Sequence, residues 1–541
     1  MPEAGKALND KEVVNRVQTR AGALRSERQT WENHWQEVTN YTVPRKDDIN
    51  YARHPGEKRS KRVYESTAIL SNEFLSGALH SMLTNPQSKW FGLSTGDKEL
   101  DSRTDVRDWL ERSVNRIHAV LNNSNFQTEI HEVYLDLGSI GTGVMSIEED
   151  DDSIVRFYSR HIREMLIAEN SKSQVDTVYR EFEMSAINLK TEFGEDKLSE
   201  DVKRSLKENP HKTHKVVHAV EPNRKEIAGV ADRFDYTSIY VLPDDGKVLR
   251  RSGFNEFPYV VPRWTKTTNE VYGRSPAMKA LADIKMINQM MKTTIEAAQK
   301  SVDPPLMVPD DGFVLPVKTY PGGLNYRRAS TQERIEPFAN QNQVDFGFQM
   351  IEMIRQKIRE HFFVDQMQLQ RQQQMTATEV LQRTEEQMRL LGPMLGRQQH
   401  ELLRPLVDRV WGIMVRKDQL PEDMPEDLEG RELEVEYVSL AAKAQRASEG
   451  QNFMRTMEMI GPVMQMRPEA VDNFDGDEAI RYLSEITGLP ARVMREERAV
   501  EELREQRQQQ QQQMQQMDQE RHESEVARNV APLQRGNNQE G

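Results

Sequence analysis

Three histidines have the spacing that most directly suggests chemistry. His211, His214 and His218 fall in the run His-Lys-Thr-His-Lys-Val-Val-His, and imidazole nitrogens are common zinc ligands. A zinc site also needs further ligands at a defined spacing, yet the chain has no cysteine and no suitably spaced carboxylate nearby. We therefore predict a loop that leads into an exposed strand, with the imidazoles in solvent.

Two other segments could hold an ion or a nucleotide. Glu148–Asp152 places five carboxylates in succession, which would suit a divalent cation, but a solvated turn between two strands is the simpler interpretation. Gly138-Ser-Ile-Gly-Thr-Gly143 is rich in glycine, yet it lacks the Lys-Ser/Thr ending and the strand-to-helix context of a phosphate loop. A turn from a helix into a strand is favoured there.

The sequence contains neither a complete phosphate loop nor a nucleophile elbow. A chain without a phosphate loop is not expected to be an ATP-driven motor, and no cofactor is expected. One enzymatic alternative remains, a metal-dependent hydrolase that uses the histidines or the acidic run. A metal assay on the purified protein separates that alternative from a structural role.

Composition favours an elongated assembly subunit. Of the 541 residues, 36% are hydrophobic and 30% are charged, and the formal net charge is −14. A DNA-gripping protein is expected to be basic, whereas an acidic surface repels a duplex and lets it slide. The absence of cysteine excludes disulfides and fits assembly in a reducing cytosol. With no signal peptide and no run of 18 apolar residues, we expect no membrane insertion.

The middle of the chain predicts two helices joined by a small β module. Apolar residues recur at helical spacing in Ser275–Lys300, where Asn288 interrupts them, and again in Val344–Phe362. Asp303–Pro337 contains six prolines and three glycines, which exclude a helix and leave short strands and turns. The expected arrangement is helix, β module, returning helix.

A polar loop and a long kinked helix follow. Val364–Met375 is rich in glutamine and has no apolar period, which predicts a loop. Thr376 and Glu379 form a capping-box pattern that opens a helix of about 40 residues. Pro393 and Pro405 each remove an intrahelical hydrogen bond, so this helix should be kinked.

The N-terminal half predicts helices followed by a mixed domain. Trp31 and Trp35 lie one helical turn apart, and core packing is favoured over partner docking for this pair. Gly143–Val261 shows short alternating runs typical of strands, with helix between Ser185 and Glu208. Asp47–Arg62 should be a surface loop, and the helices expected before the strands are Asp10–Thr39, Thr67–Leu83, Thr104–Leu121 and Thr128–Leu137.

Several short motifs occur in one order along the chain: Trp31-x-x-x-Trp35, Trp90-Phe-Gly-Leu93, Tyr272-Gly-Arg-Ser-Pro276, Met375-Thr-Ala-Thr-Glu-Val380 and Gly488-Leu-Pro490. Their order and spacing resemble the portal (head-to-tail connector) proteins of short-tailed double-stranded-DNA bacteriophages. The resemblance implies a mixed, mainly α fold with an α+β wing, stem helices, a small β clip and a helical crown, assembled as a ring. The implied boundaries are wing 1–270, stem helix 271–302, clip 303–337, stem helix 338–363, tunnel loop 364–375, long kinked wing helix 376–430, crown 431–500, and a charged, glutamine-rich helix with a disordered tail 501–541.

The same resemblance implies the site and the partners. The residues of the tunnel loop that would face a central channel are Gln366, Met367, Gln368, Leu369, Gln370, Arg371, Gln372, Gln373 and Gln374. The implied partners are eleven further copies in a ring of twelve, double-stranded DNA, major capsid and scaffolding proteins, the terminase (packaging ATPase), and tail adaptor and tail proteins. The protein would lie at a capsid vertex of the virion after assembly in the host cytoplasm. A non-portal scaffolding or adaptor protein is the other alternative.

Overall fold

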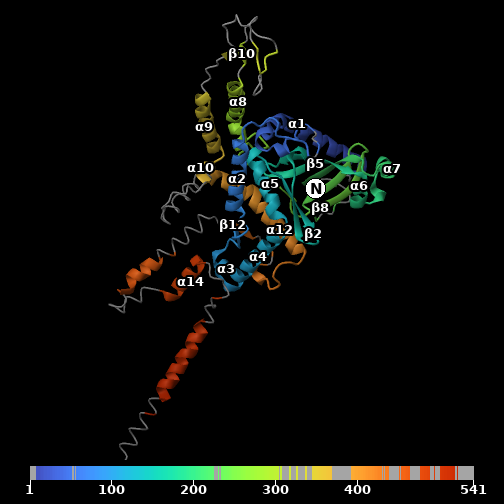
Figure 1. Cartoon of the computed structure of the whole chain (residues 1–541). Coiled ribbons are helices and arrows are strands. Elements are labelled where there is room, and N and C mark those ends of the chain that lie inside the picture. The colour runs from blue at the N-terminus through green and yellow to red at the C-terminus, as the bar shows by residue number, and fades with distance from the viewer. Residues whose placement is uncertain are drawn as a thin grey trace, which may run out of the picture. The chain divides into compact units, whose positions relative to one another are not determined.

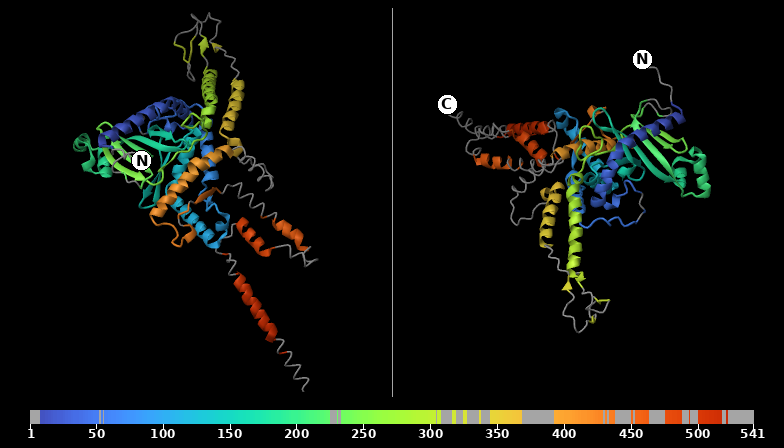
Figure 2. Two further views of the ribbon diagram at one scale, coloured as in Figure 1. Left: turned by 180° about the vertical axis from the view of Figure 1, so that it is seen from behind. Right: turned by 90° about the horizontal axis from the view of Figure 1, so that it is seen from above.

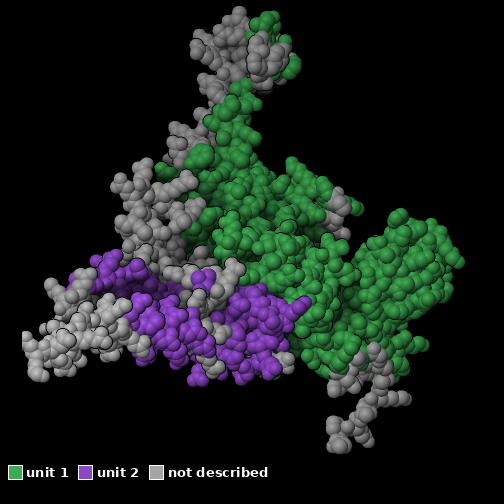
Figure 3. Space-filling view, turned by 90° about the horizontal axis from the view of Figure 1, so that it is seen from below, with its two compact units in different colours: residues 1–91, 115–420, 437–441 green, residues 92–114, 421–436, 442–541 purple. Residues whose placement is uncertain are grey.

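The chain forms two compact units in a computed structural model (Figure 3). Unit 1 comprises residues 1–91, 115–420 and 437–441, and unit 2 comprises 92–114, 421–436 and 442–541. The structure describes residues 8–51, 54, 56–224, 230, 233–303, 305–307, 316–318, 324–326, 336–337, 344–367, 392–428, 430–431, 433–437, 450, 453–462, 475–487, 493, 500–517 and 521.

An antiparallel five-stranded sheet is the centre of unit 1 (Figure 1). Its strand order is β4-β5-β6-β7-β8, with bounds β4 Met165–Glu169, β5 Val175–Ser185, β6 Thr213–Pro222, β7 Tyr236–Leu242 and β8 Lys247–Phe254. Helix α1 (Asp10–Thr42) crosses one face and buries Val13, Val17 and Leu24 against alternate residues of the strands. The residues that alternate with these along the strands, such as Val216 and Leu242, lie on the other face of the sheet. They pack against α6 (Ala186–Phe193) and α7 (Glu200–Glu208).

A second, three-stranded sheet has the order β3-β2-β9, from Ile154–Ser159, Met145–Asp150 and Tyr259–Val260. Beside it, α2 (Thr67–Leu83) packs along α5 (Phe126–Ser139). Trp35 is fully buried, and its ring lies 5.0 Å from that of Tyr272 in an edge-on contact. The tryptophan pair therefore belongs to the core, as predicted.

Helices α8 (Pro276–Val302) and α9 (Val344–His361) pack side by side and lead to a short antiparallel pair, β10 (Leu306–Met307) with β11 (Glu336–Pro337). The two views of Figure 2 show α8 and α9 side by side. The predicted sequence of helix, β module and returning helix is confirmed for these described residues. Most of 303–337 lies outside them.

The predicted long helix is described from Gly392 onward. Residues 392–398 are helical, a π-helix η4 (Gln399–Leu403) follows, and α12 (Arg404–Arg416) continues after it. The irregular turn lies immediately before Pro405, so the predicted disturbance at this proline is confirmed, as a widened turn. The capping-box residues Thr376 and Glu379 lie outside the described residues.

Unit 2 contains α3 (Lys98–Ser102), the first half of α4 (Thr104–Asn123) and α14 (Gly476–Thr487), with further helix at 453–462 and 500–517. The segment 421–436 is held to α4 by an ion pair, Arg112 to Asp423 at 2.9 Å, and by the Trp109 indole, which donates to the Pro421 carbonyl at 3.2 Å. Strands β1 (Phe91–Ser94) and β12 (Glu434–Tyr437) form a separate two-stranded sheet. Within the described part of both units, no helix is long and apolar enough to span a bilayer.

Three sequence predictions were wrong in detail. The helix expected between Ser185 and Glu208 is divided at Gly194, whose φ of +82° ends α6. The segment Asp47–Arg62 is only partly a surface loop, because Asp47 and Ile49 are buried. Strand β4 was missed because its residues are nearly all buried, so its sequence has no polar alternation.

Candidate functional site

The start of α8 is fixed by its cap. The Ser275 hydroxyl accepts from the backbone N–H of Met278 at 3.0 Å and donates to the Ser139 carbonyl at 2.6 Å. Pro276 occupies the first helical turn, where its missing N–H costs nothing. The motif Tyr272-Gly-Arg-Ser-Pro276 thus positions α8 against the end of α5.

The apolar stripe of the α8–α9 hairpin is buried only over the half next to the rest of unit 1. The buried side chains there are Ala277, Ala280, Leu281, Ile284, Ile287, Ile351, Ile354, Ile358 and Phe362. Further along the hairpin the apolar positions are open: Ile295 is 42% exposed, Phe348 53% and Val302 87%. On the outward side of the inner half, Met353, which lies between the buried Ile351 and Ile354 in the sequence, is 60% exposed. Exposed apolar groups on two adjoining helices are typical of an interaction surface.

Asn288, which interrupts the predicted stripe, has a specific function in the fold. Its side-chain oxygen accepts from the backbone N–H groups of Tyr64 and Glu65, at 2.9 and 3.3 Å, and its amide donates to the Ile284 carbonyl at 2.9 Å. The Glu65 carboxylate in turn pairs with Arg355 of α9 at 3.2 Å. A polar residue in an apolar helical stripe was the only sequence signal for this junction.

A sharp corner follows α9. Phe363 has a φ of +58°, an uncommon value for a non-glycine residue, and it turns the chain into the one-turn helix α10 (Val364–Met367). Phe362 and Val364 are buried on either side. The Asp365 carboxylate accepts from Arg359 at 2.8 Å and from Gln356 at 2.7 Å. These contacts fix the direction in which the following residues leave α9.

The predicted tunnel loop begins in this helix. Gln366 and Met367 belong to α10 and are partly buried, so the interpretation of these two residues as open loop was wrong. Val364, a buried apolar residue that follows the periodic stripe of Val344–Phe362, explains the difference. The remaining predicted loop residues, Gln368, Leu369, Gln370, Arg371, Gln372, Gln373 and Gln374, lie outside the described residues.

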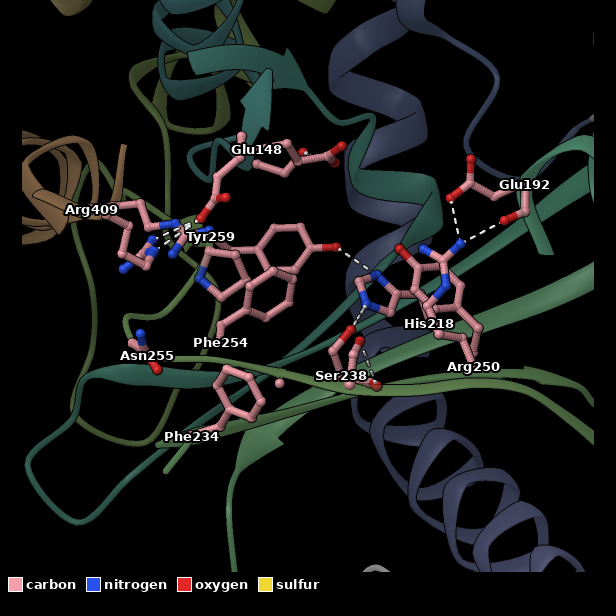
Figure 4. A pocket seen from close by; sticks show the side chains of 17 residues that line it. Glu148, Glu192, His218, Phe234, Ser238, Arg250, Phe254, Asn255, Tyr259 and Arg409 are labelled. Atoms are coloured by element: carbon pink, nitrogen blue, oxygen red, sulfur yellow. Dashed lines mark hydrogen bonds and ion pairs between the residues drawn. The ribbon is translucent and has the colours of Figure 1, made fainter. Parts of the chain in front are cut away.

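The histidine run leads into a strand, as predicted, and His211 is exposed before it, but the expectation that all three imidazoles lie in solvent was wrong for His218. Strand β6 is the central strand of the five-stranded sheet, and His218 is buried in it. Its Nε2 lies 2.9 Å from the Ser238 hydroxyl, its Nδ1 3.2 Å from the Tyr259 hydroxyl, and its ring stacks on Tyr240 at 3.9 Å (Figure 4). Burial, with smaller contributions from nearby arginines, lowers the pKa of His218 to about 3.

His218 lines a cavity of about 470 Å³ in unit 1. Phe234, Phe254 and Asn255 also face it, and Arg250 and Arg409 lie on its walls (Figure 4). The arginines are paired, Arg250 with Glu192 at 2.9 Å and Arg409 with Glu256 at 2.7 Å. The three histidines do not converge here, because only His218 lines the cavity.

The other two candidate segments are structural. Glu148 and Glu149 lie on β2 and pair with Arg160 and Arg416, at 3.0 and 2.9 Å, and the chain turns after Asp150 into β3. The predicted turn is therefore confirmed only for Asp151 and Asp152, because Glu148, Glu149 and Asp150 belong to strand β2. Among the described residues, no group of three or more His, Cys, Asp or Glu side chains could hold a metal ion.

The glycines of the other segment serve a backbone contact. Gly141 has a φ of +86°, and a Cβ built on it would lie 2.6 Å from the Gly273 carbonyl oxygen. Residues 138–143, which include Gly141, join the end of α5 to β2, as predicted. The glycine spacing therefore reflects close chain packing between the end of α5 and the start of α8.

Comparison with known proteins identifies the family. The family model described as bacteriophage head to tail connecting protein matches residues 14–494. The chain belongs to this family. It is 33% identical to the portal protein of Salmonella phage epsilon15 over 498 residues, which cover 89% of this chain and 88% of that protein. It is 31% identical to the probable portal protein of Bordetella phage BPP-1 over 482 residues, 87% of each chain.

Family membership gives the chain a structural role at the portal vertex of a phage head, where the tail is attached. It also decides between the functional classes left open by the sequence. A non-portal scaffolding protein does not agree with a match over nearly the whole chain. A metal-dependent hydrolase would need ligands that the three histidines, as folded, do not supply together.

Proposed function

We propose that copies of this chain close into a ring of twelve around a channel through which double-stranded DNA enters and leaves the capsid. The observation that carries the proposal is the exposed outer half of the α8–α9 hairpin. Its apolar residues Ile295, Val302 and Phe348 are 42–87% exposed in the single chain, and Met353, on the inner half of α9, is 60% exposed. Burying such groups is worth about 1.5–3 kcal/mol each, so a neighbouring copy gains stability by covering them.

A ring follows when one surface meets a different surface on the next copy and the rotation closes. The number twelve is the family expectation. The hairpin fits a stem in such a ring, because its two helices are long, pack together in opposite directions, and are joined by a separate β module.

The mass of the purified protein tests this proposal. Twelve copies of 62.8 kDa correspond to about 754 kDa (12 × 62.8 kDa), measurable by native mass spectrometry or light scattering. Phe348→Asp together with Met353→Asp should shift the protein toward monomers, because two carboxylates would be buried unpaired at each contact. Ile187→Asp is the matched control, since Ile187 is 44% exposed on α6, outside the hairpin.

A wild-type protein that stays monomeric or dimeric at micromolar concentration contradicts the ring. Equal dissociation by the control variant would mean that the hairpin is not the contact. Rings of eleven or thirteen copies would change only the number.

Within this ring, residues 303–337 are proposed to dock the packaging ATPase during genome entry and the tail adaptor afterwards. Residues 364–375 are proposed to face the channel. The chain itself is proposed to carry out no covalent chemistry, so the force for packaging comes from the partner ATPase. Two observations support this: the sequence has no phosphate loop, and the family is a connecting protein.

A further inference from the structure

A fully buried arginine connects α12 and its preceding π-helix to the rest of unit 1. Arg263, 1% exposed, follows β9 in the chain. Its guanidinium pairs with Glu401 at 2.8 Å and also with Glu169 of β4, and it donates to the carbonyls of Val271 and Ser173 at 3.1 and 3.2 Å. We call Arg263, Glu169, Glu401 and their partner Lys266 the Arg263 cluster.

Glu401 is the member of the cluster that belongs to the π-helix. Its carboxylate accepts from the backbone N–H and Nε of Arg263, both at 3.0 Å, and from Arg397 one turn earlier at 2.9 Å. The adjacent Gln398 donates its amide to the Arg263 carbonyl at 2.9 Å. The Tyr437 hydroxyl donates to the Gln399 carbonyl at 3.2 Å. The widened turn is therefore held from several directions.

Pro405 explains why a widened turn forms here. In a regular α-helix residue 405 would donate its N–H to the carbonyl of Glu401, and proline has no N–H and clashes with that carbonyl. The π-helix avoids the clash, because the Arg404 N–H donates to Gln399 five residues back. A single turn of π-helix is unfavourable by itself and persists where side-chain contacts support it.

The widened turn determines which side chains of residues 392–398 face the protein. After η4, Leu406, Val410 and Ile413 form the buried face of α12, and at about 100° per residue a regular helix would continue this face back to residues 399 and 395. The structure instead buries Met394 and Gln398, and a Cβ at Gly396 would meet open space. The π-helix thus rotates the upstream helix by about one residue, or roughly 100°.

We propose that Glu401, held by Arg263, is a positioning residue that keeps this helix in its π-widened register and so sets the orientation of the segment leading back to residues 364–391. Loss of the Glu401 charge removes the ion pair with Arg263 that holds the π-helical turn in its widened form. The turn then relaxes toward an α-helix that is kinked at Pro405, and residues 392–398 rotate and exchange their buried and exposed faces. The consequence for DNA passage rests on the proposed channel function.

The absence of cysteine makes the rotation measurable. Met394→Cys and Gly396→Cys each place a single thiol in the chain, and its rate of reaction with a maleimide reports exposure. In the wild-type background the thiol at 394 should react slowly and the thiol at 396 rapidly. In the Glu401→Gln background the rate should rise about tenfold at 394 and fall about tenfold at 396.

Opposite changes at the two positions are the signature of rotation. Faster labelling at both positions would mean that Glu401 only stabilises the fold, and unchanged rates would mean that it holds no register; either result overturns the proposal. Glu401→Asp, which keeps the carboxylate, should restore rates close to wild type. Pro405→Ala supplies the missing N–H without changing the ion pairs, and it should also raise the labelling rate at 394 and lower it at 396. This second variant keeps the proposal testable if Glu401→Gln misfolds.

Genome retention in assembled particles separates this inference from the proposed function. Particles built with Glu401→Gln should package poorly or lose DNA if the rotated segment leads into the channel. Rotation in the labelling experiment with normal packaging and retention would leave the register inference standing and contradict the channel-facing assignment of residues 364–375.

Discussion

His218 shows how the surroundings of one residue decide its chemistry. In the sequence it is the third member of a possible metal-binding run, but in the fold it is a neutral imidazole inside a sheet, hydrogen-bonded to Ser238 and Tyr259. Desolvation is the main cause of its lowered pKa, followed by the charges of Arg180, Arg160 and Arg250. The buried ring therefore makes the stability of unit 1 depend on pH.

The sign of this dependence follows from the two states. The unfolded chain binds a proton at His218 near pH 6.5, whereas the folded chain does so near pH 3. The contribution of His218 to the free energy of unfolding is fully present above pH 6.5 and is lost as the pH falls toward 3. Between pH 6.5 and 5.0 the loss should be about 2 kcal/mol.

We expect His218→Gln, which keeps hydrogen-bonding capacity, to remove this component. The measurement is the free energy of unfolding by urea at pH 7.0 and 5.0, followed by tryptophan fluorescence. His211→Gln is the control, because His211 is exposed before β6 begins. An equal pH dependence in His218→Gln and wild type would show that His218 is not the responsible group.

Gly141 is the second residue whose role the fold decides. Gly141→Ala should destabilise unit 1 by about 3 kcal/mol or more, because it adds left-handed strain to a Cβ contact of 2.6 Å with the Gly273 carbonyl. Gly194→Ala has nearly the same φ, +82°, but nothing within 4 Å, so it should cost only the backbone strain of about 1–3 kcal/mol and less than Gly141→Ala. Thermal unfolding of the two variants compares them, and equal losses would mean that the close approach to Gly273 does not matter.

At the scale of elements, residues 364–375 follow the α8–α9 hairpin in the chain. If residues 364–375 face DNA, neutral glutamines contact a moving duplex without the phosphate affinity that lysines would add. Gln372, Gln373 and Gln374 changed together to Lys should assemble normally yet stall packaging or leak packaged DNA. The measurement is packaged genome length per particle. The same glutamines changed to Asn are the control, and normal packaging by the Lys variant would place the loop outside the channel.

At the scale of the whole molecule, the β module should be separable from ring formation. Deleting residues 310–324 should leave the ring mass, reduced by the missing residues, intact, while pull-downs of the packaging ATPase and the tail adaptor fail. The reason is that the apolar contact surface proposed for the ring lies on α8 and α9, where Phe348 and Met353 are exposed. Loss of the ring itself would instead make the module part of the subunit contact.

The sequence by itself determined the features that depend on local apolar periodicity and on turn-forming and helix-ending residues. The helices Thr67–Leu83 and Pro276–Val302, the β hairpin around Asp150 and the disturbance at Pro405 were all predictable, because apolar spacing, turn residues and proline act within a few residues. The ordered motifs likewise indicated the family, which the comparisons confirmed.

Only the tertiary structure decided which residues are buried together. His218 became a core residue because β6 is flanked on both sides by strands, and Asn288 became an anchor because Tyr64 and Glu65 lie beside it, 223 or more positions away in the chain. The pairing of Arg263 with Glu401 likewise joins residues separated by 138 positions. No local pattern encodes such contacts, because burial and pairing depend on which distant elements pack together.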